Sequence, residues 1–449
     1  MLIVTLDVLA PRMAGPAIRA WHLAEQLTRQ HEVVLVSPKT VSLPPGLVDV
    51  RQVTERQLRD LMAWCNVVIF QGFVLEQYPF LANDDTMVIV DAYAPLYLEQ
   101  LEQSKGLGAV AHGHVVAKGV AAINAQLLQA DFVMCASERQ RDLYLGKLGA
   151  LGRINPQTYD EDPTLRSLID VVPFGLPATA PVHRRQAMKG VVPGIGADDQ
   201  VVLWGGGVYN WFDPLTLIRA MAAIAITRPG VKLFFLGLVH PNPDVEEMDM
   251  AGQARRLSAE LGLTGTTVFF NESWVPYDRR ADYLLEADAA VSTHSDHVES
   301  AFAFRTRVLD YLWAGLPMVL TEGDSLATVV AEAGAGRTVP PSDVEALAAT
   351  ILEVLEPKAA AECRTRAVEL AQAFTWEQAV GPLARAVAFG RRAADGNRAS
   401  RASPSGPIQA PGRSGTVRRD LSLARSVVRT GGLGAMLPPL RRRWQRLSR

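Results

Sequence analysis

The sequence predicts an α/β protein made of two doubly wound domains, each with a parallel sheet. Short apolar runs of strand length alternate along the chain with amphipathic stretches of helix length, which is the pattern of parallel sheets covered by helices. The alternation lapses over residues 179–199, where Pro, Gly and a His-Arg-Arg run replace the apolar spacing, and then resumes. The 449 residues are 48% hydrophobic, which is ample material for two cores. We therefore expect domains over residues 1–178 and 200–372, joined by the linker 179–199.

In the first domain the apolar runs predict a series of strands. These are Leu2–Leu6, Glu32–Ser37, Val67–Gln71, Thr86–Asp91, Phe132–Ser137 and Ile169–Pro173. The stretches between them have the spacing of helices that cover a sheet. These are Ala17–Arg29, Glu55–Trp64, Val115–Gln129 and Glu138–Leu148. Each expected helix lies between two expected strands, so the connections are crossovers between parallel strands.

The second domain repeats this architecture. Its expected strands are Val201–Trp204, Lys232–Gly237, Thr267–Phe270, Ala289–Thr293 and Pro317–Thr321. Its expected helices are Pro214–Ile226, Gly252–Leu261, Asp278–Glu286, Arg305–Ala314 and Ser325–Glu332, with later helices over Asp343–Leu355 and Ala359–Phe389. We expect the last part, residues 373–390, to cross back to the first domain.

Residues 391–449 differ in composition from the rest of the chain. They hold 14 Arg, no Lys and only two acidic residues, and they are rich in Ser, Gly and Pro. Such a segment cannot bury enough apolar surface to fold alone, so we expect a disordered basic tail. Its end mixes arginines with Trp444 and leucines, as membrane-surface segments do, although a solvated basic tail has the same composition. Because the net charge of the whole chain is −2, the folded part is acidic, which argues against general nucleic-acid binding.

The cysteines and the N-terminus indicate the compartment. Cys65, Cys135 and Cys363 are far apart and form no CxxC pair, which fits free thiols in a reducing environment. The run Met1–Leu6 lacks the basic region and long apolar stretch of a signal peptide, and no segment has the length needed to span a bilayer. We expect a cytoplasmic protein, peripheral on the inner face of the cell membrane if its tail binds anionic lipid.

A glycine-rich loop is the first candidate for binding chemistry. Gly205, Gly206 and Gly207 follow an apolar strand and precede a helix that opens with Asp213 and Pro214. Glycines let backbone N–H groups approach a ligand, and a helix N-terminus attracts anions. Asp213 fits the N-cap and Pro214 the first helical position. The loop is therefore expected to hold a phosphate, or else to serve tight packing alone.

Further candidates lie in loops after strands, where ligands collect in parallel sheets. His294, Asp296 and His297 are residues of metal-ligand type, but their spacing forms no recognised zinc motif, so we expect no metal site. Hydrogen bonding in a cleft is the expected role of His294. No G-x-S-x-G turn is present, which argues against a nucleophilic serine site.

Several segments resemble retaining, nucleotide-sugar-dependent glycosyltransferases of family 4. They are AGPAIRAWHLAEQL, DFVMCASERQRDLYLG, VVLWGGGVYNWFDPLTLIRAM, SWVPYDRRADYLLEADAAVST and ESAFAFRTRVLDYLWAGLPMVLTEGD. The resemblance implies the GT-B fold, in which two facing Rossmann-like domains enclose the active cleft. It covers about residues 1–390 and is most specific over Asp310–Asp324.

The resemblance assigns roles in binding the nucleotide-sugar donor. Asp310 matches the acidic residue that holds the ribose hydroxyls. Arg307, one turn earlier, is expected to contribute to catalysis beside the diphosphate, unless the two form an ordinary surface pair. Trp274, Val275 and Tyr277 match the base-binding loop, where the rings stack on the base or serve packing.

In the first domain, two further positions receive roles. Gly15 is expected to let the loop before the first helix close on the donor phosphates. Asp91, at the end of a strand, is a candidate catalytic residue that contacts the sugar or the acceptor, or else caps a helix.

The sequence also departs from the family pattern. A glutamate usually lies eight positions before the ribose-binding acid, where this chain has Phe302; Glu299, three residues farther back, is the candidate replacement and a candidate catalytic residue. The basic pair usual at the first turn of the second domain is absent. The phosphate charge is therefore expected to meet the glycine-loop amides and Arg305 or Arg307.

Together these observations predict retaining, metal-independent transfer of a hexose from a nucleotide diphosphate sugar to a hydroxyl acceptor, with no cofactor. A cell-surface polysaccharide or lipid-linked glycan is the expected acceptor. A nucleotide-sugar epimerase on the same fold and a non-catalytic nucleotide-sugar scaffold remain alternatives. An NAD-dependent oxidoreductase is disfavoured because no G-x-G-x-x-G motif starts at Gly205.

Overall fold

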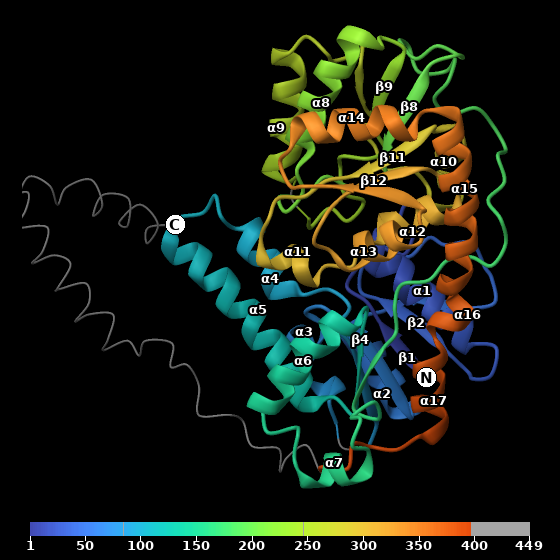
Figure 1. Ribbon diagram of the computed structural model, residues 1–449. Coiled ribbons are helices and arrows are strands. Elements are labelled where there is room, and N and C mark those ends of the chain that lie inside the picture. Colours follow the sequence, from blue (N-terminus) through green and yellow to red (C-terminus); the bar gives the residue numbers. More distant parts are fainter. Residues whose placement is uncertain (84, 246, 397–449) are drawn as a thin grey trace, which may run out of the picture. The chain divides into compact units, whose positions relative to one another are not determined.

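The computed structural model describes residues 1–83, 85–245 and 247–396 (Figure 1). The fold below is that of the unit Met1–Arg401. Residues 397–449, which make up most of the expected basic tail, lie outside the described residues.

The first sheet contains seven strands in the order β3-β2-β1-β4-β5-β6-β7. They are β1 (Leu2–Val4), β2 (Val34–Ser37), β3 (Asp49–Gln52), β4 (Val67–Gln71), β5 (Met87–Asp91), β6 (Phe132–Cys135) and β7 (Ile169–Val171). Every neighbouring pair is parallel. The strand order reverses between β1 and β4, so the crevice at their carboxyl ends is the place where such sheets bind ligands.

Helices cover both faces of this sheet. They are α1 (Gly15–Leu27), α2 (Glu55–Trp64), α3 (Val74–Gln77), α4 (Leu96–Gln103), α5 (Ala109–Gln129), α6 (Glu138–Ala150) and α7 (Pro156–Glu161), with a 3-10 turn at Pro79–Leu81. Side chains alternate across a strand. Leu2 and Val4 therefore pack in one core with α2 and α5, while Ile3 packs in another with α1.

The second sheet contains six parallel strands in the order β10-β9-β8-β11-β12-β13. They are β8 (Gln200–Trp204), β9 (Val231–Phe235), β10 (Val268–Phe270), β11 (Ala289–Ser292), β12 (Met318–Thr321) and β13 (Gly336–Val339). This order repeats that of the first six strands of the first sheet. The predicted α/β fold with two parallel-sheet, Rossmann-like domains is therefore confirmed.

Helices also surround the second sheet. They are α8 (Pro214–Thr227), α9 (Asp249–Glu260), α10 (Arg280–Glu286), α11 (Val298–Phe302), α12 (Thr306–Trp313), α13 (Ser325–Glu332), α14 (Val344–Val354) and α15 (Pro357–Ala371), with 3-10 turns at Tyr277–Arg279 and Gln372–Phe374. Figure 1 shows α8 and α14 side by side, where α8 packs on β9 and α14 on β12 and β13, and Val202 and Trp204 of β8 lie in the same core.

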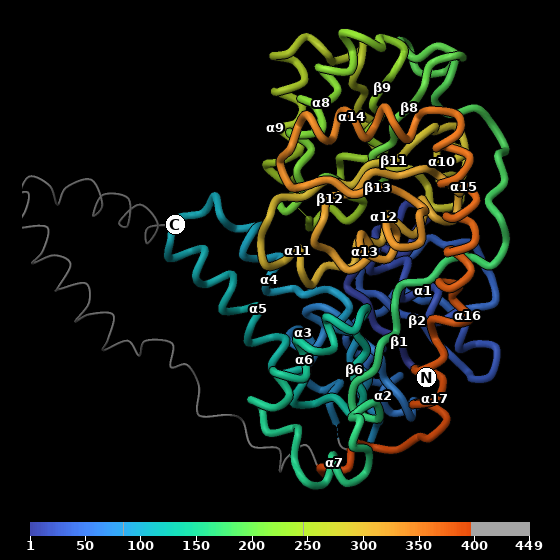
Figure 2. The backbone as a smooth tube through the Cα atoms, in the orientation of Figure 1, coloured from blue at the N-terminus to red at the C-terminus, as the bar shows by residue number. Residues whose placement is uncertain are grey.

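The chain returns to the first domain after α15. Leu176 exchanges backbone hydrogen bonds with Phe374 (2.7 Å) and Trp376 (2.9 Å). The Trp376 ring stacks on His22 of α1, with the ring centroids 4.8 Å apart. Figure 2 shows this last stretch, through α16 (Trp376–Ala379) and α17 (Gly381–Phe389), alongside the first domain.

Two expectations for this part of the chain were wrong. The stretch Ala359–Phe389 is not one continuous helix, because Thr375 caps a new helix by accepting a hydrogen bond from the Gln378 N–H. Residues 391–396 do not begin a solvated tail. Asp395 forms an ion pair with Arg153 (2.5 Å), and both side chains are buried against the first domain.

Candidate functional site

Two adjoining cavities lie at the carboxyl ends of the strands, between the two sheets. The first has a volume of about 150 Å³ and the second about 360 Å³. Both are lined by residues of both domains, and they share Gly15, Tyr209, Thr306 and Arg307. This is the position at which parallel sheets bind ligands. We therefore take the two cavities together as the candidate site and call them the cleft.

The three glycines of the expected phosphate-binding loop line the first cavity, but their structural roles differ. The Gly205 N–H donates to the Tyr311 hydroxyl (2.8 Å), and a Cβ at this position would lie 2.8 Å from the Tyr311 ring. Gly205 is therefore a packing glycine whose N–H is already engaged. Gly206 has φ +86°, a conformation that favours glycine. The Gly207 carbonyl accepts a hydrogen bond from Arg307 Nη2 (2.7 Å).

Contrary to expectation, the helix after the glycine loop does not present its N-terminus to the cleft. Asp213 is the N-cap of α8, as predicted, and its carboxylate accepts hydrogen bonds from both the N–H and the hydroxyl of Thr216. That N-terminus is therefore closed by its own cap, and among the described residues none of α8 lines the cleft. Helix α1 begins at Gly15, which lines both cavities, and it has no side-chain cap.

Arg307 is a buried cation where the two cavities meet. Its guanidinium lies 4.0 Å from the ring centroid of Phe212 and 4.6 Å from that of Trp204. Nη1 is buried and has no hydrogen-bond partner, and no carboxylate of the described residues pairs with the side chain. Burial lowers the pKa of Arg307 to about 10, so it is charged at neutral pH. The surface pair with Asp310 does not form.

Asp310 lines the first cavity and is held by a residue that the sequence reading missed. Arg280 Nε donates to Asp310 Oδ1 (3.0 Å), and Arg280 Nη1 donates to the Tyr277 carbonyl (2.9 Å). The Arg280 guanidinium also lies over the Tyr277 ring, 3.7 Å from its centroid. Within the described ranges no hydrogen bond or ion pair engages the second carboxylate oxygen of Asp310, so this cavity-lining residue retains an acceptor.

The expected base-binding loop closes the first cavity against the first domain. Trp274, Val275 and Tyr277 all line it. The Trp274 indole N–H donates to the Met13 carbonyl (2.9 Å), and the Tyr277 hydroxyl lies 2.9 Å from His22 Nε2. These contacts join the loop to the segment just before Gly15 and to helix α1.

Glu299 and Arg305 bind each other instead of facing the cleft together. The two guanidinium nitrogens of Arg305 donate to the two oxygens of Glu299 at 2.9 and 2.6 Å. Glu299 is fully buried and lines neither cavity, whereas Arg305 lines the second. The structure therefore places Glu299 as the counter-ion of Arg305.

Asp91 lines the second cavity and is likewise engaged. Arg19 of α1 donates to both its oxygens, at 2.7 and 2.9 Å, and Arg19 is completely buried. Asp91 caps no helix. Its ion pair fixes α1 to β5, which positions the N-terminus of α1 at the cleft.

His294 lies beneath the cleft and lines neither cavity. Burial lowers its pKa to about 4, so it is neutral at pH 7, with Nε2 3.7 Å from Asp324.

Within the described ranges no group of three or more His, Cys, Asp or Glu side chains could hold a metal ion. None of the described helices combines the length and apolar character that a membrane span requires.

Some cleft residues were not found from the sequence. Besides Arg280, these include Tyr209 and Glu99, which line the second cavity. Glu99 lies on the short helix α4, beyond the loop that follows β5. The only sequence feature that could have indicated a cleft position is that it comes shortly after a strand end. Burial, and then the charge of Glu299, raise the pKa of Glu99 to about 8.

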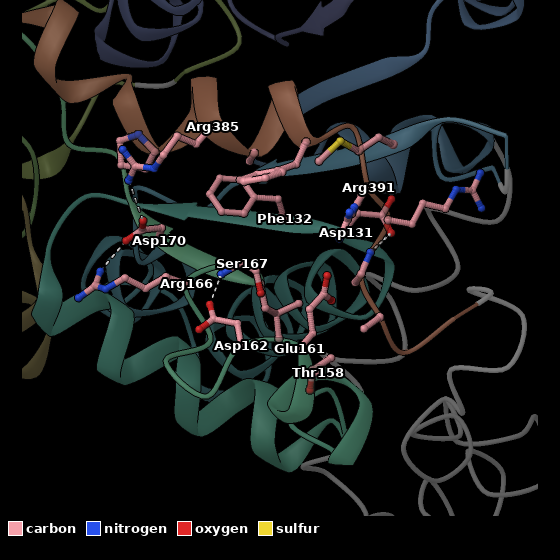
Figure 3. A pocket seen from close by; sticks show the side chains of 18 residues that line it. Asp131, Phe132, Thr158, Glu161, Asp162, Arg166, Ser167, Asp170, Arg385 and Arg391 are labelled. Atoms are coloured by element: carbon pink, nitrogen blue, oxygen red, sulfur yellow. Dashed lines mark hydrogen bonds and ion pairs between the residues drawn. The ribbon is translucent and has the colours of Figure 1, made fainter.

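A third cavity, of about 460 Å³, lies elsewhere in the first domain (Figure 3). Its walls include Met87 and Phe132, which stand at the amino ends of β5 and β6. Figure 3 shows Asp170 between Arg166 and Arg385, with which it forms ion pairs. This cavity is therefore at the edge of the sheet opposite the ligand-binding edge.

Comparison with known proteins identifies the second domain. Residues 199–357 match the family model of the group 1 glycosyl transferases. These residues are a glycosyltransferase domain. A D-inositol 3-phosphate glycosyltransferase of Acidothermus cellulolyticus is 28% identical over 213 residues, which cover 46% of this chain and 46% of that protein. A protein of the same name from Mycolicibacterium smegmatis is 28% identical over 222 residues, 49% of this chain and 46% of that protein. The chain thus spans about half the length of the curated relatives it matches.

Solved structures extend the likeness to both domains of the glycosyltransferase fold. Sucrose-phosphate synthase from Thermosynechococcus elongatus superposes with a TM-score of 0.61 at 18% identity, over 87% of this chain and 99% of that one. Anabaena HepE in complex with UDP-glucose superposes with a TM-score of 0.60 at 14% identity, over 86% of this chain and 99% of that one. The predicted GT-B architecture is confirmed.

Proposed function

We propose that this protein transfers a hexose from a nucleotide diphosphate sugar to a hydroxyl acceptor, with retention of anomeric configuration and without a metal or other cofactor. The observation that carries the proposal is the Arg307 guanidinium, which no carboxylate of the described residues neutralises, in a cleft between two Rossmann-like domains. A buried cation without a counter-ion is costly, and an anionic ligand removes that cost. The diphosphate of a donor is such an anion, and the neighbour HepE is known in complex with UDP-glucose.

Different residues of the cleft then bind different parts of the donor. Arg307 Nη1 and the amides near Gly206 and Gly15 meet the diphosphate, whose negative charge grows as the glycosidic bond breaks; fixed positive groups at that point stabilise the transition state. Asp310 accepts a hydrogen bond from a ribose hydroxyl, and Tyr277 borders the base. Closure over the donor excludes water and favours transfer over hydrolysis.

Calorimetric titration with UDP tests the donor site. Arg307→Met should weaken UDP binding about 100-fold, the usual effect of removing one partner of a buried charge pair, and Arg307→Lys should weaken it less. Arg59→Met, which removes an exposed arginine of α2, is the control and should bind as the unaltered protein does. Unchanged binding in Arg307→Met, with an unchanged melting temperature, would contradict the proposal.

Product analysis separates the proposal from its alternatives. With UDP-glucose and no acceptor, an epimerase converts the donor by itself, whereas a glycosyltransferase leaves the sugar unchanged or hydrolyses it slowly. Nuclear magnetic resonance of the transferred sugar reports its anomeric configuration, and activity that persists in EDTA supports metal independence. A scaffold would bind UDP without any turnover.

A cell-surface polysaccharide or a lipid-linked glycan is the proposed acceptor, which places the protein in the cytoplasm on the inner face of the cell membrane. The support is the composition of residues 391–449, whose arginines are attracted to anionic lipid. A chain ending at residue 396 should lose co-sedimentation with anionic vesicles. Equal co-sedimentation of the two chains would contradict this part of the proposal.

A further inference from the structure

Among the described residues that line the second cavity, little positive charge remains available to a ligand. Arg305 is engaged by Glu299 on both of its terminal nitrogens, and Arg19, behind the cavity wall, is engaged by Asp91. His240 accepts a hydrogen bond from the Asn242 N–H (3.1 Å), and burial lowers its pKa, so the ring is neutral. Of the described residues lining this cavity, Arg307 alone keeps an unpaired cation, and the donor diphosphate takes it under the proposed function.

The cavity does offer an uncommitted carboxyl group. Glu99 lines it from α4, and within the described ranges no hydrogen bond or ion pair engages its carboxyl oxygens. The charged groups that act on it from the facing domain are Glu299 and Arg305. Burial and the charge of Glu299 raise the pKa of Glu99 to about 8, and the same two effects oppose any further negative charge placed beside it.

Aromatic rings complete the wall on the side of the second domain. The rings of Tyr209 and Trp211 stack with centroids 4.9 Å apart and planes at 14°, and both line the cavity. Flat apolar rings next to a few polar groups suit a compound with apolar ring faces and hydroxyl edges. Sugars and cyclic polyols have this character.

We infer that the second cavity takes its acceptor as an uncharged sugar or polyol, with one hydroxyl group hydrogen-bonded to the Glu99 carboxyl, and rejects acceptors that carry a phosphate monoester. This rests on the proposed function, because it assigns Arg307 to the donor. A phosphate group in the cavity would lose its hydration with no cation to replace it. The chain would thereby differ from the relatives that are named for D-inositol 3-phosphate.

The test uses matched acceptor pairs that differ by one phosphate group. With UDP-glucose as donor, transfer is measured by mass spectrometry to inositol and D-inositol 3-phosphate, glucose and glucose 6-phosphate, and mannose and mannose 6-phosphate. For each pair that reacts, kcat/KM should be at least about 100-fold higher for the unphosphorylated member. Preference for a phosphorylated member would overturn the inference. Transfer to no member of any pair, in a protein that binds UDP, would also count against it.

Variants on one helix locate the effect. Glu99→Gln should lower kcat/KM for the unphosphorylated acceptor about tenfold and leave UDP affinity unchanged. Glu99→Lys should reduce the ratio of kcat/KM between the unphosphorylated and the phosphorylated member of each pair at least about tenfold, because the lysine supplies the missing cation. Glu102→Gln, on α4 but outside the cavity lining, is the matched control and should change neither quantity.

Identical kinetics of Glu99→Gln and Glu102→Gln would overturn the assignment of Glu99. The melting temperature of each variant shows whether it folds. Failure of UDP to bind the unaltered protein would instead contradict the proposed function, so the two failures are separate.

Discussion

Arg307 shows how much of a site depends on partners far away in the sequence. Its position one turn before Asp310 left a surface pair open as the alternative to a place beside the diphosphate, yet Asp310 binds Arg280 and Arg307 binds the carbonyl of Gly207. Gly15, Asp91 and the glycine loop, which were singled out because they follow strand ends, all line the cavities. The sequence did not predict the partner of each arginine, because tertiary packing and not the spacing along the chain decides which carboxylate it pairs with.

Glu99 should make stability depend on pH. Its pKa is raised from 4.5 to about 8, so between these pH values the folded chain keeps a proton that the unfolded chain loses. The stability that protonated Glu99 contributes is therefore full below about pH 4.5 and is lost as the pH rises toward 8. Glu99→Gln, which cannot ionise, should be more stable than the unaltered protein by about 4 kcal/mol at pH 8 and by only about 1 kcal/mol at pH 5. Thermal melting from pH 5 to pH 8 measures this, and a pH-independent difference would contradict it.

At the scale of the element, periodicity located the apolar strands and the amphipathic helices and missed the strands with few buried side chains. Helix α2, strand β4 and helix α13 have the bounds expected from the sequence. Strand β3 was missed because it lies at the sheet edge with mostly exposed residues and has no apolar alternation. Strand β13 was missed because only its first and last residues are buried.

The Arg19–Asp91 pair should stabilise the docking of α1 on β5. Asp91→Asn leaves the buried Arg19 guanidinium without a counter-ion and should cost about 3–5 kcal/mol of unfolding free energy. Glu55→Gln in the exposed Arg59–Glu55 pair of α2 is the control and should cost less than about 0.5 kcal/mol. Urea denaturation measures both. Normal stability with lost turnover in Asp91→Asn would instead indicate that Asp91 acts on the substrate.

At the scale of the whole molecule, the chain crosses from the second domain to the first and is fastened there near its described end. Asp395 pairs with Arg153, whose side chain is almost completely buried. A chain ending at residue 390 loses this pair. It should melt several degrees lower than the full chain, because the buried Arg153 guanidinium then lacks the Asp395 carboxylate. A chain ending at residue 396 keeps the pair and should melt as the full chain does. Equal melting of the two truncated chains would show that the pair contributes nothing.

The central claim is that the cleft between the two domains binds a nucleoside diphosphate at Arg307. A crystal structure of the protein with UDP tests it most directly. We expect a phosphate oxygen within hydrogen-bond distance of Arg307 Nη1, the ribose at Asp310 and the base beside Tyr277. A cleft that stays empty while UDP occupies the cavity between Asp131 and Arg385, or no site at all, would contradict the account.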